Sequence, residues 1–174
     1  MKTLISTLIL LLGLLFACKP TPKQETAVKP TATDTVEQVG KPVPQAWQRL
    51  TSMVGEYMYD SVLFKLPAVH DSLQAILPPE VFKSMQTNWN VASELKRTNN
   101  ILCVSGCKHN ACFSNMWILM VDIANSVMNV YHIEDHKMTV YKGRQLITLP
   151  EGLENYMTTM KKNGKVAESD IVIK

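Results

Sequence analysis

The fold is decided by residues 116–141, which read MWILMVDIANSVMNVYHIEDHKMTVY. This stretch holds three runs rich in β-branched and aromatic residues, at 116–123, 127–133 and 138–141, and such runs are typical of strands. Asn125-Ser126 separates the first two runs and a polar cluster at 134–137 separates the last two, as in tight hairpins. We therefore expect three antiparallel neighbours in one sheet.

The sequence on either side of this stretch supplies two more strands and three helices. Strands are expected at 101–105 and 171–173 because both runs are short and rich in β-branched residues. Apolar residues recur at helical spacing after Pro67, after Pro79 and from Leu153 to Met160. Strands grouped apart from helices indicate an α+β fold, with an antiparallel β-sheet and helices packed on one side.

The N-terminus has the pattern of an export signal. A basic start is followed by an apolar run, Leu8 to Phe16, which is too short to cross a bilayer as an ordinary helix. Residues 1–17 are therefore expected to be a signal peptide. The tetrapeptide Leu15-Phe16-Ala17-Cys18 resembles the bacterial lipobox, which implies lipidation of Cys18. The alternative is a plain signal peptide cleaved nearby.

Residues 18–46 are expected to form a linker after the lipidated cysteine. This segment is dominated by Pro, Thr, Lys and Gln and has almost no large apolar residue, so it cannot bury enough surface to offset its ordering entropy. Residues 47–174 then form one domain by length. We expect a protein of the bacterial cell envelope, lipid-anchored on the periplasmic side of the outer membrane.

The charge of the chain is weak. The net charge of +3 becomes +2 when the signal peptide, with Lys2 as its one charged residue, is removed. No block of Lys and Arg is present, and a nucleic-acid partner is not expected. No nucleophile and base pattern and no glycine-rich phosphate loop stands out, so we expect neither an enzyme nor a cofactor.

Cys107 and Cys112 enclose the four residues Lys108, His109, Asn110 and Ala111. In an exported chain two such cysteines are expected to form a disulfide. The enclosed residues provide a cation and an imidazole but no acidic group. This composition predicts a rigid binding loop that fits a pocket lined with carboxylates. The alternative is a disulfide that only staples a solvated surface connection.

Zinc is a second alternative for the same region, through Cys103, Cys107, His109 and Cys112. It is less favoured because no C-x-x-C pair is present and the compartment is oxidising. We expect no metal site. Cys103 lies in an apolar strand and is expected to be a buried thiol. The other three histidines are expected to be surface or packing residues: His70, His132 and His136.

The chain from Gly55 to Tyr141 resembles the inhibitor of vertebrate lysozyme (Ivy) family of bacterial envelope proteins. The resemblance rests on Gly55-Glu56-Tyr57, on Leu66-Pro67-Ala68-Val69 with Leu73 and Leu77, on Ile101 to Gly106 leading directly into the cysteine loop, and on the following Val121-Asp122. The most specific part is the cysteine pair with four residues between, preceded by Gly.

The resemblance implies an inhibitor whose disulfide-closed loop, of the form Cys-Lys-Pro-His-Asp-Cys, enters the lysozyme cleft with its His against the catalytic carboxylates. Cys107, Lys108 and Cys112 match that form. His109 occupies the Pro position, Asn110 the His position and Ala111 the Asp position, so the imidazole is displaced by one. Dimers occur in the family, so the resemblance also allows a homodimer.

Two functions follow from these patterns. The first is inhibition of lysozyme, or of a related peptidoglycan-cleaving glycoside hydrolase, by insertion of the loop into the active-site cleft. The second is a non-inhibitory envelope lipoprotein that uses an Ivy-like fold for partner binding or assembly. A lysis assay with the purified domain distinguishes them.

Overall fold

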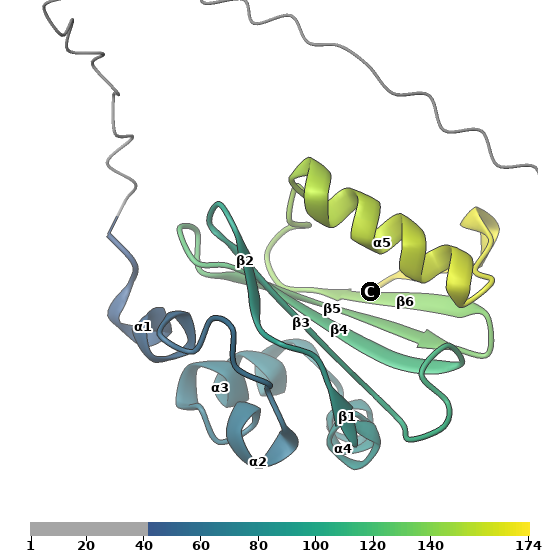
Figure 1. Ribbon diagram of the computed structural model, residues 1–174, viewed down its shortest axis with the longest axis horizontal. Helices are drawn as coiled ribbons and strands as arrows, with labels where there is room; N and C mark the ends of the chain where they lie inside the picture. Colours follow the sequence, from purple (N-terminus) through teal and green to yellow (C-terminus); the bar gives the residue numbers. More distant parts are fainter. Residues whose placement is uncertain (1–41) are drawn as a thin grey trace, which may run out of the picture. The chain divides into compact units, whose positions relative to one another are not determined.

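Seven strands form one sheet in the part of the chain that the structure, a computed structural model, describes: residues 42–174 (Figure 1). The helices are α1 (Gln45–Thr51), α2 (Asp60–Leu63), α3 (Pro67–Ile76), α4 (Pro79–Asn88) and α5 (Glu151–Asn163). The strands are β1 (Val91–Ala92), β2 (Lys96–Thr98), β3 (Ile101–Cys107), β4 (Asn115–Asp122), β5 (Val127–Glu134), β6 (Lys137–Lys142) and β7 (Ile171–Ile173). A short 3₁₀-helix, Glu168–Asp170, precedes β7.

The sheet has the order β1-β3-β4-β5-β6-β7, and β2 also pairs with β3. All pairs are antiparallel except β6 and β7, which run parallel. Both predicted hairpins are present. Ser126 lies in the turn between β4 and β5 and has a positive φ. Asp135 and His136, in the turn between β5 and β6, also have positive φ values. The α+β class and the antiparallel core of the sheet are therefore confirmed.

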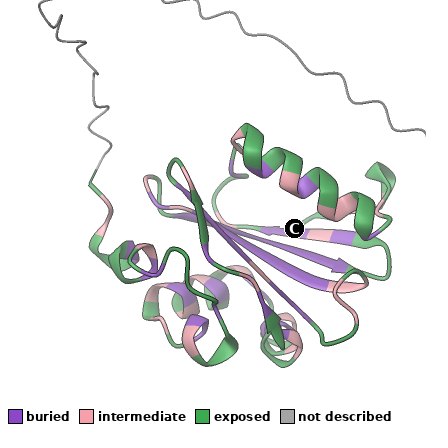
Figure 2. Ribbon diagram, in the orientation of Figure 1, coloured by how far each residue is buried: buried purple, intermediate pink, exposed green. Residues whose placement is uncertain are grey.

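The sheet is covered on both faces, which differs from the expected single layer of helices. Trp117 and Leu119 of β4 pack with α1 to α4, whereas Ile118 and Met120 pack with α5. Figures 1 and 2 show α5 alone on one side of the buried strands and the other four helices on the opposite side. A strand that is apolar on both faces has to be covered on both. The near-continuous apolar run of β4 is the sequence signal for this arrangement.

Proline defines the starts of two helices as predicted. Pro67 and Pro79 occupy first-turn positions of α3 and α4, where the missing N–H removes no helical hydrogen bond. The fold begins earlier than the expected boundary at residue 47, since α1 starts at Gln45 and its Trp47 and Leu50 are buried. The short elements α2, β1 and β2 were not predicted, because segments of two to four residues carry no measurable periodicity.

The end of α4 is fixed against the end of β3. Trp89 is buried, and its indole Nε1 donates a hydrogen bond to the carbonyl of Met58 at 2.8 Å. Its ring lies directly on Gly106, where an added Cβ would overlap the ring carbons. The glycine is therefore required by close packing. This contact fixes the position of the residue pair Gly106-Cys107, from which the cysteine loop starts.

Candidate functional site

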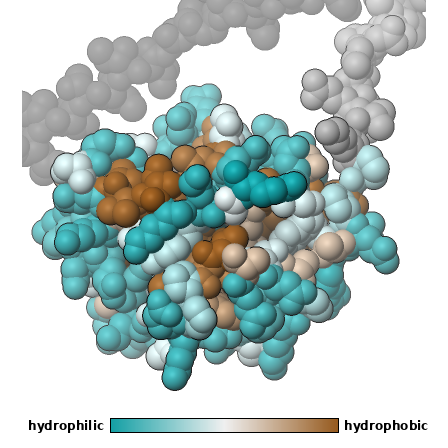
Figure 3. All heavy atoms as spheres, turned by 180° about the vertical axis from the view of Figure 1, so that it is seen from behind, coloured by the Kyte–Doolittle hydropathy of each residue, from teal (hydrophilic) through white to brown (hydrophobic). Residues whose placement is uncertain are grey.

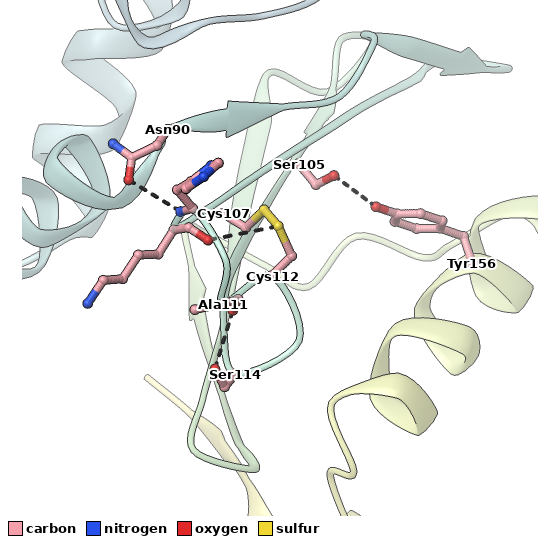
Figure 4. The surroundings of a disulfide bond; sticks show 9 residues. Asn90, Ser105, Cys107, Ala111, Cys112, Ser114 and Tyr156 are labelled. Atoms are coloured by element: carbon pink, nitrogen blue, oxygen red, sulfur yellow. Dashed lines mark hydrogen bonds between the residues drawn. A yellow bond between two sulfur atoms is a disulfide. The ribbon is translucent and has the colours of Figure 1, made fainter.

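The cysteine loop joins β3 to β4 at one end of the sheet. Cys107, the last residue of β3, forms a disulfide with Cys112, and the two Cα atoms are 4.9 Å apart (Figure 4). Closure of the predicted loop is therefore confirmed. The tip residues Lys108, His109 and Asn110 are all exposed, and Ala111 is half-buried.

Backbone hydrogen bonds hold the loop in one shape. The N–H of Ala111 donates to the carbonyl of Lys108 at 3.0 Å, which makes a tight turn through His109 and Asn110. Asn110 has a φ of 60°, a left-handed conformation that Asn tolerates better than most residues. The N–H of Asn115 donates to the carbonyl of Ala111 at 2.7 Å and closes the base. Covalent and hydrogen-bonded closure together preorganise the tip.

Asn90 positions this loop and was not found by the sequence reasoning. Its backbone N–H donates to the carbonyl of Cys107 at 3.0 Å, and its side-chain Oδ1 accepts from the N–H of His109 at 3.5 Å. Its Nδ2 donates to the carbonyl of Thr87 in α4 at 3.1 Å (Figure 4 shows the bond to the loop). Because Asn90 is distant in sequence from the loop, no local pattern could have indicated this role.

The loop is cationic, but a carboxylate lies near its base. Lys108 and His109 are the only ionisable side chains between the two cysteines. Glu134, at the end of β5, accepts a hydrogen bond from Asn115 Nδ2 at 3.2 Å. The carbonyl oxygen of the same side-chain amide, Asn115 Oδ1, is buried with no partner among the described residues. The tip can therefore offer donors to a carboxylate ligand, while its base is held by polar contacts within the protein.

Cys103 stands apart from the loop. It is a buried, unpaired thiol, and burial raises its pKa to about 12, although the nearby Lys96 acts in the opposite direction. Cys107 and Cys112 are bonded to each other and have no thiolate to offer a metal. Within residues 42–174 no group of three His, Cys, Asp or Glu side chains is placed to hold a metal ion.

The remaining histidines make packing and hydrogen-bond contacts. His70 meets Phe82 edge to face, with ring centroids 5.4 Å apart. His132 is buried and stacks flat on Trp117, with centroids 3.5 Å apart. His136 Nδ1 lies 2.8 Å from the carbonyl oxygen of Gly164. All three lie outside the cysteine loop, and the buried Nε2 of His132 has no hydrogen-bond partner among the described residues.

Cys18 lies outside the described residues, as do the expected signal peptide and most of the linker. Among the helices that are described, none has the length and apolar character needed to cross a bilayer.

Comparison with known proteins gives one family. The sequence profile of the family described as "Inhibitor of vertebrate lysozyme (Ivy)" matches residues 68–163, more than half of the chain. The match runs from α3 to the end of α5 and includes the whole cysteine loop. Neither a curated protein nor a solved structure matches the chain.

Proposed function

This chain belongs to the inhibitor of vertebrate lysozyme (Ivy) family, and on that premise we propose that its cysteine loop enters and blocks the active-site cleft of a lysozyme or a related peptidoglycan-cleaving glycoside hydrolase. The family is one of protein inhibitors, which agrees with the expectation that the chain is not an enzyme. The observation that carries the proposal is the exposed, disulfide-closed tip with a lysine and a histidine adjacent in sequence.

The chemistry of the target favours this tip. Retaining glycosidases hold two carboxyl groups about 5 Å apart in an open cleft. The ammonium of Lys108 and the imidazole of His109 can donate to both carboxyl groups while the loop excludes the sugar. Hydrogen bonds to charged groups contribute roughly 1.5–3 kcal/mol each. Because the disulfide and the backbone bonds already order the loop, little conformational entropy is lost on binding.

The order of residues in the tip indicates which side chain would make each contact with the target. His109 stands where the family has Pro, and Asn110 stands where the family has His. We therefore assign the imidazole contact to His109 and a neutral amide contact to Asn110. The variant Asn110→His restores an imidazole at the family position, and His is among the residues that tolerate a positive φ. We expect this variant to inhibit as well as the wild type or better.

A second function is favoured by the same displacement. A domain with the family fold but without a His at the family position would act as a non-inhibitory envelope lipoprotein. It would serve partner binding or assembly. The net charge supports this alternative too, because the chain is slightly basic, as animal lysozymes often are, so long-range attraction is absent. If the chain does inhibit lysozyme, its affinity has to come from the fit of the loop in the cleft.

Membrane anchoring is part of the proposal. We propose that Cys18 is lipidated and that the domain is held on the periplasmic side of the outer membrane. The support is the short apolar run that ends at Ala17-Cys18. Cys18→Ser in the full chain should move the protein from the membrane fraction to the soluble fraction or stall its processing. A variant that is processed normally and stays in the membrane would contradict the anchor.

Inhibition is tested by mixing the purified domain with an animal lysozyme and following the lysis of cell walls by turbidity. The proposal expects slower lysis that saturates as inhibitor is added. Reduction of the disulfide should weaken this effect. If the wild-type domain slows no lysozyme but Asn110→His does, the displaced imidazole is the reason and the non-inhibitory function is favoured.

A further inference from the structure

A small hollow lies beside the root of the cysteine loop. Its volume is about 190 Å³, and its walls come from β1, β3, β4, the loop and α5. The residues that give it an apolar lining are Val91, Cys107, Cys112, Phe113, Met116 and Met160. The two disulfide cysteines therefore close the loop and also form a wall of this hollow. The hollow therefore adjoins the base of the loop that carries the tip.

Two large apolar side chains stand exposed at the hollow. Phe113 directly follows the loop and is 58 % exposed, and Val91 of β1 is 39 % exposed. The other exposed large apolar residues of the described chain lie elsewhere: Val54, Tyr57, Tyr59, Leu146, Val172 and Ile173. Viewed from behind, hydrophilic residues cover most of the molecular surface, and hydrophobic residues gather in limited areas (Figure 3). Phe113 and Val91 together with the hollow form a contiguous apolar patch, which is the kind of surface that marks an interaction site.

The polar groups on the wall of the hollow already have partners. The hydroxyl of Ser93 accepts from the N–H of Ser105 at 2.9 Å. Tyr156 of α5 donates its hydroxyl to Ser105 Oγ at 3.1 Å (Figure 4). A polar guest would therefore find few free groups here. The hollow is suited to an apolar side chain.

The tip alone is too small to account for a stable complex. A specific protein interface of standard size uses about 20 residues or more on each side and buries about 800 Å² per partner. The loop offers four residues between its cysteines. Contact must therefore extend onto the neighbouring surface, where an exposed aromatic residue such as Phe113 is of a type enriched at protein interfaces.

We propose that the hollow, with Phe113 and Val91 at its edge, is a second contact surface for the hydrolase that the loop binds, and that it receives an apolar side chain from the rim of that enzyme's cleft. This inference rests on the proposed function. The apolar contact would add affinity that the weak net charge of the chain does not provide, because burial of apolar surface needs no long-range electrostatic attraction.

The test is a binding titration of the purified domain with an animal lysozyme, using Phe113→Ala, Val91→Ala and the double variant. We expect the double variant to raise Kd about tenfold or more, and Phe113→Leu, which keeps most of the apolar area, to bind nearly as the wild type does. The loss in the double variant should be the same at low and high salt, whereas the loss in Lys108→Ala should shrink as salt increases.

Leu146→Ala is the matched control. Leu146 is 44 % exposed and lies in the connection after β6, where its neighbours Gln145 and Ile147 are bonded to Asn129 rather than to the loop. It should bind as the wild type does. If Lys108→Ala and His109→Ala weaken binding but the double variant does not, the second contact surface is wrong and the proposed function stands. If the wild-type domain binds no lysozyme, both are overturned.

Discussion

The cysteine loop and the sheet behind it differ in side-chain burial and in the interactions that hold them in place. In the loop the side chains between the cysteines are polar or small, and order comes from a disulfide and four backbone hydrogen bonds among residues 108–115. In β4 and β5 almost every side chain is buried, on both faces. The side chains of the tip thus contribute little to the folding free energy, and the buried side chains of β4 and β5 are not available to a partner. Substitutions in the two regions should give opposite results.

The largest effect on stability is expected at Gly106, where the two regions meet. Gly106→Ala places a methyl group into the ring of Trp89, whose indole is fixed by its bond to Met58. Overpacking of this kind costs about 3 kcal/mol or more when the neighbour cannot move. Urea unfolding measures the loss.

Gly152→Ala is the control for that variant. Gly152 lies in α5, and an added Cβ there meets nothing within 4 Å. Since Ala is the better helix former, this variant should be as stable as the wild type or more stable by up to about 1 kcal/mol. Equal destabilisation of both variants would contradict the role of close packing at Gly106.

The next largest effect is a loss of stability at acid pH, which we expect from the buried His132 of β5. Burial lowers the pKa of His132 from 6.5 to about 4. Between these values the unfolded chain binds a proton that the folded chain does not, so stability is full above pH 6.5 and falls as the pH drops towards 4. The loss from this group amounts to about 3 kcal/mol below pH 4.

His132→Phe separates this group from the other titrating residues. It keeps the flat contact with Trp117 and removes the ionisation. Urea unfolding at a series of pH values should give a smaller slope between pH 6.5 and 4 for this variant than for the wild type. The same slope in both proteins would show that His132 is not the source.

The disulfide is expected to have an intermediate effect on stability. Closure of so short a loop stabilises a fold by about 2 kcal/mol in the chain-entropy account. The double variant Cys107→Ala with Cys112→Ala should lose about this amount in urea unfolding, while inhibition should fall by more than tenfold because the tip is no longer preorganised. Unchanged inhibition would mean that the disulfide serves the fold and not the contact.

The sequence was sufficient for the long elements. The runs at β3 to β6 and the stripes of α3, α4 and α5 carry strong periodic signals, and their positions were predicted to within a few residues. The second apolar face of the sheet was not predicted, although the unbroken run of β4 encodes it. An unbroken run fits burial on both faces, whereas single-sided burial gives alternation.

The residues of the candidate site were predicted from the sequence, but the residues that hold the loop in position were not. The cysteine pair and the tip residues are adjacent in sequence, so their closure could be inferred from the spacing together with the export signal. Asn90 and Val91 approach the loop only because α4 ends against β3 through Trp89 and Gly106. Such contacts depend on tertiary packing, and no local pattern reports them.

The most direct test of the account compares inhibition and stability in the same tip variants. Lys108→Ala and His109→Ala should each weaken inhibition of lysozyme about tenfold, equal to about 1.4 kcal/mol, while the melting temperature stays within a degree or so of the wild type. This result would locate the contact in the exposed tip. Tip variants that inhibit as well as the wild-type domain would contradict the account and place the contact surface elsewhere.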